Sequence, residues 1–192
     1  EIDVAYYTID SGNVALTLLD RLRQAARRGF QVRILVDGLQ ARLPSDVAQA
    51  LQQDGIELRS YHPPLTGRPL WLNRRLHYKL LVVDRQAIIV GSRNLEDSHF
   101  GLDKDNFVDM DALLTGDICR QAAEHFQALW NTDEVLPIDK SHFASQFALT
   151  HKNLDFERRI REAEARLAAM PFMTARAYAE SNQALRTSVA VV

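Results

Sequence analysis

The sequence predicts an α/β protein in which a mixed β-sheet is flanked by helices and is followed by a helical C-terminal segment. Three observations indicate this class. Strand-like and helix-like patterns alternate over residues 2–61, two later apolar runs are separated only by a short turn, and the chain after Pro137 is charged with helical periodicity. Alternating strands and helices are typical of parallel strands, whereas a short turn joins antiparallel ones. The sheet is therefore expected to be mixed.

The first third of the chain supplies the parallel part of this sheet. Its strands are short apolar runs, and its first helix has Val14, Leu18 and Leu22 on one face. Glycine ends both helices, as is common at helix C-termini. Right-handed crossovers then bring successive strands together. The expected order is a strand at 2–7, a helix that Ser11 caps and that runs to about Arg28, a strand at 31–37, a helix that starts at Ser45 and is stopped by Gly55, and a strand at 56–61.

The middle of the chain predicts a β-hairpin with strands at 76–83 and 87–91. Asp84 and Arg85 form its turn, and both apolar runs are nearly continuous, as in strands buried on both faces. After a polar stretch, a further strand is expected at 107–114. Asp117 can then cap an amphipathic helix that ends at Trp130.

Composition limits the organisation and the partners. Residues 1–140 are expected to form one catalytic half and residues 141–192 a helical connector toward a second half, because both ends of the sequence resemble cut ends of a longer protein. A formal net charge of −2 provides no global basic field, so nucleic acid is not an expected partner. No apolar run reaches the ~18 residues that a membrane-spanning helix needs.

The residues that indicate chemistry lie in the hairpin. His77 and Lys79 are two apart, so on a strand both side chains point to the same face. A lysine within an apolar strand is costly to bury unless an anion or a partner awaits it. The second strand ends in Gly91, Ser92, Arg93 and Asn94, and a hairpin places this end beside His77. A nucleophile, a fixed positive charge and neutral donors therefore converge on one point, as binding of a phosphodiester requires.

Each of these residues alone has a structural explanation. A single histidine on a strand is more often structural than functional, and an aspartate at a hairpin turn, such as Asp84, commonly bonds nearby backbone amides. The glycine-to-asparagine ending is also frequent at the ends of strands. Together, however, the residues from His77 to Asn94 satisfy HxKxxxxDxxxxxxGSxN, which arises by chance only a few times per million chains of this length.

The segment HYKLLVVDRQAIIVGSRN resembles the signature of the phospholipase D superfamily. Further segments resemble the first half of bacterial cardiolipin synthases of the C-type branch. These are DVAYYTIDSG, ARRGFQVRILVDGL, LNRRLHYK, FVDMDALLTG and the helix that ends in HFQALWN. The resemblance covers residues 2–138 and implies a phosphatidyltransferase with a phospholipid substrate, no cofactor and no metal. It also implies peripheral membrane contact at the bacterial inner membrane or its cytoplasmic face.

The resemblance implies a two-step displacement. His77 would form a covalent phosphohistidine, a second histidine would protonate the leaving alcohol, and Lys79 with Ser92 and Asn94 would bind the phosphate oxygens. Asp84 completes the motif. The acid that hydrogen-bonds the nucleophile's other ring nitrogen corresponds to Asp109, and Asp111 on the same face is an alternative.

The sequence contains only one such motif. Of the six histidines, only His77 begins an HxK, so the second histidine must come from a second half of the same full-length chain or from a homodimer partner. The narrower resemblance favours the missing half. Two alternative functions remain: a metal-independent phospholipase D-like nuclease acting as a homodimer, and a non-catalytic half that serves as a lid or interaction surface.

Overall fold

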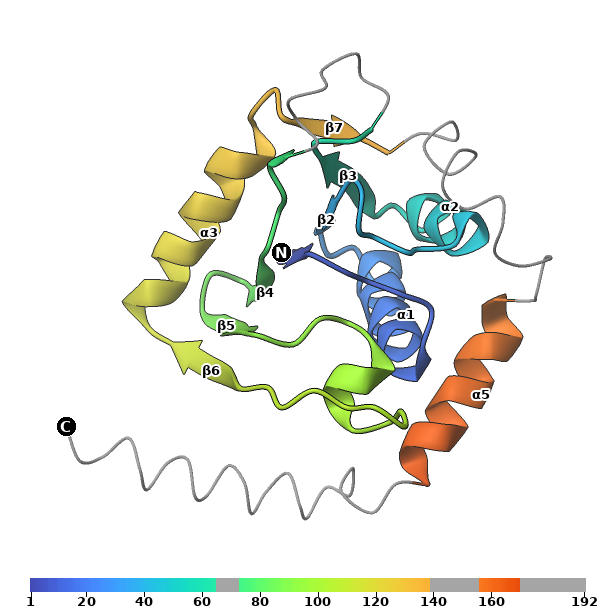
Figure 1. The fold of residues 1–192 in the computed structure, drawn as a ribbon. Coiled ribbons are helices and arrows are strands. Elements are labelled where there is room, and N and C mark those ends of the chain that lie inside the picture. Colours follow the sequence, from blue (N-terminus) through green and yellow to red (C-terminus); the bar gives the residue numbers. More distant parts are fainter. Residues whose placement is uncertain (65–72, 139–155, 170–192) are drawn as a thin grey trace, which may run out of the picture.

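The computed structural model of this chain describes residues 1–64, 73–138 and 156–169. A single seven-stranded sheet runs through this part of the chain in the order β6-β5-β4-β1-β2-β3-β7 (Figure 1). The strands are β1 Ile2–Tyr6, β2 Val32–Asp37, β3 Glu57–Tyr61, β4 Lys79–Val83, β5 Ala87–Gly91, β6 Asp111–Thr115 and β7 Val135–Pro137. The helices are α1 Asn13–Arg27, α2 Ser45–Gln53, the short 3₁₀ helix η2 Asp97–Phe100, α3 Asp117–Trp130 and α5 Phe156–Ala168.

The sheet is mixed, which confirms the predicted fold class. β1, β2 and β3 are parallel neighbours, as their connecting helices require. β4 returns antiparallel to β1, β5 to β4 and β6 to β5, and β7 runs antiparallel to β3 at the other edge. The β4–β5 hairpin turns at Asp84 and Arg85, whose φ angles of 51° and 55° are those of a two-residue turn that matches the strand twist.

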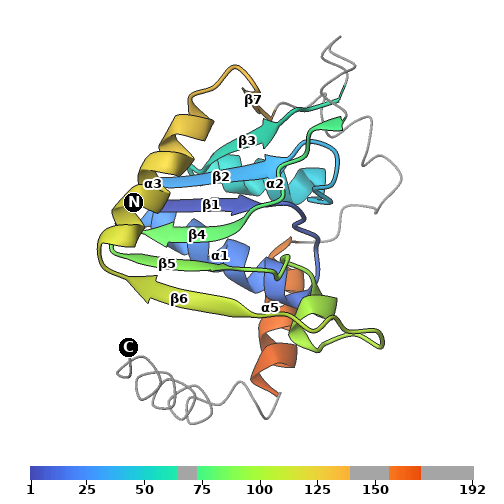
Figure 2. The same ribbon diagram turned by 60° about the vertical axis from the view of Figure 1, so that its left-hand side comes forward.

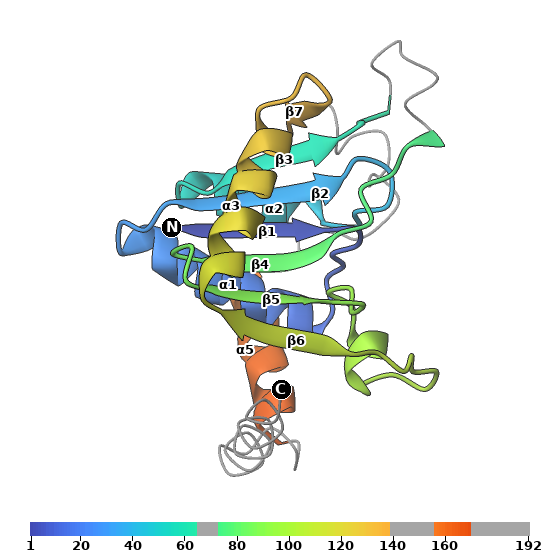
Figure 3. The ribbon, with the colours of Figure 1, turned by 90° about the vertical axis from the view of Figure 1, so that its left-hand side faces the viewer.

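Helices cover the two faces of the sheet unequally. Figure 2 and Figure 3 show α3 lying across one face, with α1, α2 and α5 on the other. Val4 and Ile34 lie in the core beneath α1, α2 and α5, whereas Ala5 and Leu35 lie in the core beneath α3. This alternation is the period of two along each strand that the sequence predicts. α5 lies in the predicted connector and packs on the α1 core through Ile160.

Two strands begin several residues later than predicted, and one strand was not predicted. The strand predicted at 76–83 begins at Lys79, where its pairing with the last residue of β1 begins. The strand predicted at 107–114 begins at Asp111, opposite Gly91 at the end of β5. β7 was not predicted, because three residues that include Pro137 give too short a pattern. The remainder of the connector, at 141–155 and 170–192, lies outside the described residues, and the domain boundary stays a prediction.

The N-terminus of α1 is capped from a distant part of the chain. Gly12 precedes the helix, and the carboxylate of Asp97 accepts hydrogen bonds from the backbone N–H groups of Asn13 and Val14, both over 3.0 Å. A carboxylate here satisfies orphan donors and complements the helix dipole. The predicted cap, Ser11, is thus replaced by a residue of η2, and this contact anchors η2 to α1.

The β5–β6 end of the sheet is poorly covered. The hairpin strands were predicted to be buried on both faces, but Ile89 and Val90 of β5 are 39% and 36% exposed. Leu113 on β6 and Met110 ahead of it are also exposed. This uncovered end has the character of a surface that another element covers. Among the described helices, none is long and apolar enough to cross a membrane.

Candidate active site

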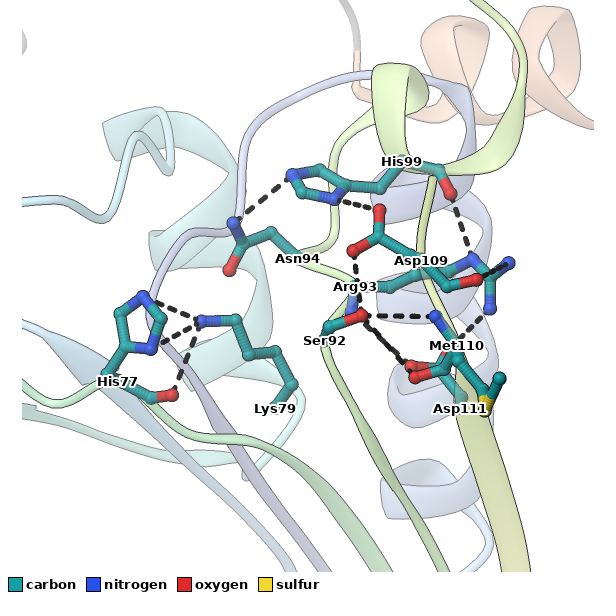
Figure 4. A network of polar contacts seen from close by, with 9 residues as sticks. All are labelled: His77, Lys79, Ser92, Arg93, Asn94, His99, Asp109, Met110 and Asp111. Atoms are coloured by element: carbon teal, nitrogen blue, oxygen red, sulfur yellow. Dashed lines mark hydrogen bonds and ion pairs between the residues drawn. The ribbon is translucent and has the colours of Figure 1, made fainter. Parts of the chain in front are cut away.

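His77 and Lys79 meet where the chain enters β4. His77 lies two residues ahead of the strand, but the segment still runs beside β1, because the N–H of Tyr7 donates to the carbonyl of Tyr78 over 2.9 Å. Lys79 Nζ lies 3.2 Å from each ring nitrogen of His77, as Figure 4 shows. The cation and the imidazole are therefore held together at one end of the sheet.

The ammonium of Lys79 is enclosed without a carboxylate partner. Lys79 is only 6% exposed, and its polar contacts in the described part of the chain are to the ring and the carbonyl oxygen of His77. Burial lowers the pKa of Lys79, and the more distant charges of Asp109 and Glu96 oppose this effect. An enclosed cation without a bonded anion favours binding of a negatively charged group.

Tyr7, which sequence reasoning missed, forms the floor beneath both groups. Its ring centroid lies 4.7 Å from that of His77 and 5.0 Å from Lys79 Nζ. The negative face of an aromatic ring stabilises a nearby cation. Tyr7 directly follows β1, so the strand that pairs with β4 also fixes this ring. Its position after the first strand gave no signal of this role.

The end of β5 brings Ser92 to the neighbouring β6 segment. Gly91 is required for this approach, since a Cβ at this position would overlap the Asp111 carboxylate and the Met110 carbonyl. Ser92 Oγ donates to Asp109 Oδ1 over 2.8 Å and accepts from the Met110 N–H over 3.1 Å. The chain that approaches Gly91 closely is thus the neighbouring β6 segment, and the hydroxyl proton of Ser92 is directed at Asp109.

Asn94 points from its loop toward the His77–Lys79 pair in Figure 4. Its Nδ2 lies 3.2 Å from Nε2 of His99, whose Nδ1 lies 2.7 Å from Asp109 Oδ2. Asp109 was predicted to bond the nucleophile. Within the described residues its carboxylate is bonded to Ser92 and His99, and its role toward an attacking histidine stays a prediction. His99 was also missed, because it lies outside the motif.

Asp111 and Asp84 lie apart from this group. Asp111 Oδ2 lies 3.0 Å from Nη1 of Arg93 and its Oδ1 accepts from the Arg93 N–H, so this acid fixes the loop after β5. Asp84 lies in the hairpin turn at the end of β4 opposite to Lys79, where its N–H donates to the carbonyl of Glu1. The structure therefore brings together His77 and Lys79, with Asn94 directed toward them, but leaves Asp84 at the far end of the strand.

A cavity of about 650 Å³ lies between β4, β5, β6 and α3. Tyr78, Leu80 and His125 are among its lining residues, and the Tyr78 hydroxyl lies 2.7 Å from His125 Nε2. Leu80 belongs to the core beneath α3, whereas Leu81 packs toward α1. Side chains alternate along β4, so the Lys79 side chain shares the face of Leu81, but His77 and Lys79 are also among the residues that line this cavity.

The site offers a nucleophile, an unbalanced cation and an amide donor. An imidazole can attack phosphorus, and a fixed cation can stabilise the negative charge on the phosphate oxygens. The described part of the chain contains no group of three or more acidic, histidine or cysteine side chains placed to bind a metal ion.

Comparisons with known proteins identify the family of this chain. The family model described as "Cardiolipin synthase, PLD-like domain" matches residues 1–130. Cardiolipin synthase C of Escherichia coli is 31% identical over 150 residues, which cover 72% of this chain and 32% of that protein. An uncharacterised Helicobacter pylori protein is 30% identical over 167 residues, covering 80% of this chain and 32% of its own length. This chain thus spans about a third of these relatives.

Solved structures share the fold. The phospholipase D family member Nuc from Salmonella typhimurium superposes with a TM-score of 0.50 at 20% identity, over 71% of this chain and 80% of its own. NucT from Helicobacter pylori gives a TM-score of 0.50 at 15% identity, over 71% of this chain and 81% of its own. At this identity the likeness indicates a common fold and leaves the substrate open.

Proposed function

The chain belongs to the cardiolipin synthase-type domain family of the phospholipase D superfamily, and we propose that it is the first half of a phosphatidyltransferase of the C-type branch. In this proposal a phospholipid is the substrate, and the reaction proceeds through a covalent phosphohistidine at His77. The proposal requires neither a metal nor a cofactor. It includes peripheral contact with the inner membrane of a bacterium, or with the cytoplasmic face of that membrane, where such a substrate is available.

The observation that supports this function most strongly is the contact between Lys79 and His77. The enclosed ammonium lies 3.2 Å from both nitrogens of the proposed nucleophile and has no bonded carboxylate in the described part of the chain. A phosphodiester would supply the missing negative charge and place its phosphorus beside the imidazole. Because the cation is fixed before the substrate binds, it stabilises the transition state without further reorganisation.

The proposed reaction has two displacements. In the first, a nitrogen of neutral His77 forms a bond to phosphorus while the bond from phosphorus to the first alcohol oxygen breaks. That oxygen takes a proton from a second imidazole. In the second, the acceptor alcohol gives its proton to this imidazole, its oxygen attacks phosphorus, and the P–N bond to His77 breaks. Two steps of this kind replace one difficult exchange.

The second imidazole is proposed to come from a second HxKxxxxD half, supplied by the same full-length protein or by a homodimer partner. The uncovered end of the sheet at β5 and β6 supports this proposal, because it adjoins Ser92 and Asp109. Phe107 and Met110 ahead of β6 are 62% and 81% exposed. Apolar side chains gathered beside an incomplete site are typical of a surface that a second protein unit covers.

The nuclease alternative receives less support from the charges near the site. Arg74 lies 2.6 Å from Glu134, Arg75 lies 3.2 Å from Asp37, and Arg93 lies 3.0 Å from Asp111. Each arginine is thus neutralised by a carboxylate. A nucleic-acid backbone requires cations available along its path, because each bound phosphate needs a positive partner.

Transfer assays on the protein expressed from the full open reading frame test this function. With labelled phosphatidylglycerol vesicles, the label should move to a second lipid or an added alcohol. His77→Asn should reduce the rate at least about a thousandfold, the scale for loss of a nucleophile. Arg85→Gln, which changes an exposed side chain in the β4–β5 turn at the far end of β4, is the control and should transfer normally. Cleavage of DNA without lipid transfer would instead support the nuclease.

A separate experiment on the 192-residue chain itself tests whether the reaction needs a second half. As a monomer, this chain should show no phospholipid turnover, because one imidazole cannot serve as nucleophile and as acid in the same step. Analytical ultracentrifugation of the assayed sample defines its oligomeric state. Robust turnover by a demonstrated monomer would contradict the need for a second half.

A further inference from the structure

His99 lies outside the HxKxxxxD motif, yet it joins two residues of the site. Its Nδ1 lies 2.7 Å from Asp109 Oδ2 and its Nε2 lies 3.2 Å from Asn94 Nδ2 (Figure 4). The side chains of His99 and Asp109 are only 10% and 9% exposed. The imidazole also stacks on Phe107, with the ring centroids 4.6 Å apart. This contact pattern fixes both the position and the plane of the ring.

The segment that bears His99 is itself anchored. η2 begins with Asp97, which caps α1 through the N–H groups of Asn13 and Val14. The carbonyl oxygen of His99 accepts a hydrogen bond from Nε of Arg93 over 2.9 Å. The backbone is therefore tied to a helix on one side and to the loop after β5 on the other. A side chain on such a frame is suited to hold a neighbour in place.

The ionised state of Asp109 determines which atom donates in each of these hydrogen bonds. Burial raises the pKa of Asp109, but the hydrogen bonds from Ser92 and His99 outweigh this effect and hold it below its usual value. An ionised carboxylate accepts only, so Nδ1 of His99 must donate to it. In neutral His99, Nε2 then accepts a hydrogen bond from the Asn94 amide N–H. The donors run from Ser92 to Asp109, from His99 to Asp109, and from Asn94 to His99.

This direction leaves a specific part of Asn94 available. One of its two amide protons is used by His99, so the second remains for another acceptor. Its Oδ1 is buried and accepts no hydrogen bond among the described residues. In Figure 4, Nδ2 of Asn94 lies on the side of His99 and Oδ1 on the side of Lys79. Without His99 the amide is free to rotate, and its free N–H group, which can bind a phosphate oxygen, loses its fixed direction.

We propose that His99 is a positioning residue for anion binding, which holds the Asn94 amide with its free N–H toward the phosphodiester. The inference rests on the proposed function of His77 and Lys79, and it adds a residue that the motif does not contain. His99 does not touch the substrate in this proposal. It acts through Asn94, and Asp109 fixes its tautomer, as second partners of a histidine commonly do.

The test measures binding of inorganic phosphate to the 192-residue chain by calorimetry. His99→Phe retains an aromatic ring against Phe107 but removes both polar contacts, and it should weaken phosphate binding at least about tenfold, the scale of one hydrogen bond to a charged group. His99→Gln can donate to Asp109 and accept from Asn94, so it should restore part of the loss. Arg85→Gln removes a positive charge at the far end of β4, so it is the control and should bind phosphate as the unchanged chain does.

A spectroscopic measurement separates positioning from a general structural role. Nitrogen-15 NMR of the unchanged chain should show His99 protonated at Nδ1, and Asp109→Asn should alter this tautomer. Added phosphate should shift the side-chain amide signal of Asn94 in the unchanged chain but not in His99→Phe. Protonation of neutral His99 at Nε2, or unchanged phosphate affinity in a folded His99→Phe variant, would overturn the proposal.

Lys79→Met distinguishes this inference from the proposed function. If phosphate binding depends on Lys79 but not on His99, the inference about His99 fails while the anion site stands. If the unchanged chain binds no phosphate in the presence of an intact fold, the anion site itself fails and both proposals are overturned.

Discussion

Replacement of Lys79 by methionine separates catalytic from structural contributions at this site. Methionine keeps an unbranched side chain of similar length and removes the charge. In the proposed reaction the ammonium faces an anionic phosphate at about 4 Å. At an effective dielectric constant of about 20, two unit charges at this distance interact by about 4 kcal/mol. Loss of this term corresponds to about a thousandfold lower rate, since about 1.4 kcal/mol is tenfold.

The effect on stability should have the opposite sign. Burial lowers the pKa of Lys79 in the folded protein, so the charged form is disfavoured on folding. This cost is fully present below the folded pKa and disappears as pH rises from the folded pKa to the unfolded one. Lys79→Met should therefore leave the free energy of unfolding unchanged or raise it at pH 7, and any gain should shrink in alkaline solution.

Two measurements on the same samples test this prediction. Phosphatidyl transfer gives the rate, and urea unfolding at pH 7 and pH 10 gives the free energy of unfolding. Transfer should fall about a thousandfold while stability is maintained. A variant that loses stability and activity together would show that Lys79 mainly supports the fold. Full activity in the variant would refute the charge as the source of phosphate binding.

Three further predictions concern other residues of the chain. Asp84→Asn should reduce transfer much less than Lys79→Met, because Asp84 lies in the turn at the opposite end of β4; a loss as severe in the same assay would place Asp84 in the reaction. Gly91→Ala should lower the free energy of unfolding by about 1–3 kcal/mol, because its Cβ would overlap Asp111 and the Met110 carbonyl; urea unfolding at pH 7 measures this, and an unchanged midpoint would contradict it. Burial, together with the nearby acids, raises the pKa of Asp10 to about 6, so the ionised carboxylate lowers the stability of the folded protein. This cost appears as pH rises from about 4 to about 6, so Asp10→Asn should be more stable than the unchanged chain at pH 8, by on the order of 2 kcal/mol, but not at pH 4. Equal stability at pH 8 would contradict the raised pKa.

The parts of the fold that depend on local pattern were predictable. Strands β1, β2 and β3 and the β4–β5 hairpin follow from apolar runs bounded by turn residues, and Asp84 suits the left-handed backbone of its turn. α3 spans Asp117–Trp130 and ends where its amphipathic pattern predicted, although Gly116 rather than the expected Asp117 takes the N-cap position. Periodicity and turn chemistry require no knowledge of distant residues.

Features that depend on distant residues were not predictable. β4 begins at Lys79 because its partner β1 ends at Tyr6, and no residue near His77 encodes that limit. The cap of α1 comes from Asp97, some 84 positions away, although Ser11 is a good local candidate. In each case a tertiary contact replaced the arrangement that local preference favoured.

Part of the candidate site was predictable from the sequence, and part was not. His77, Lys79 and Asn94 belong to a motif with fixed spacing, so the sequence alone indicated them. Tyr7 and His99 belong to no motif, and they join the site only because β1 pairs with β4 and η2 packs on α1. Spacing identifies groups that chemistry requires, but it does not identify the groups that hold them.

Covalent trapping tests the central claim, that His77 is the nucleophile, most directly. The protein from the full open reading frame is incubated with labelled phospholipid, the acceptor is withheld, and the denatured protein is mapped by peptide. The label should be covalently attached, acid-labile and base-stable, as a phosphoramidate requires, and it should lie on the peptide that contains His77. Label found only on a histidine of another half would contradict this assignment and make His77 the general acid instead.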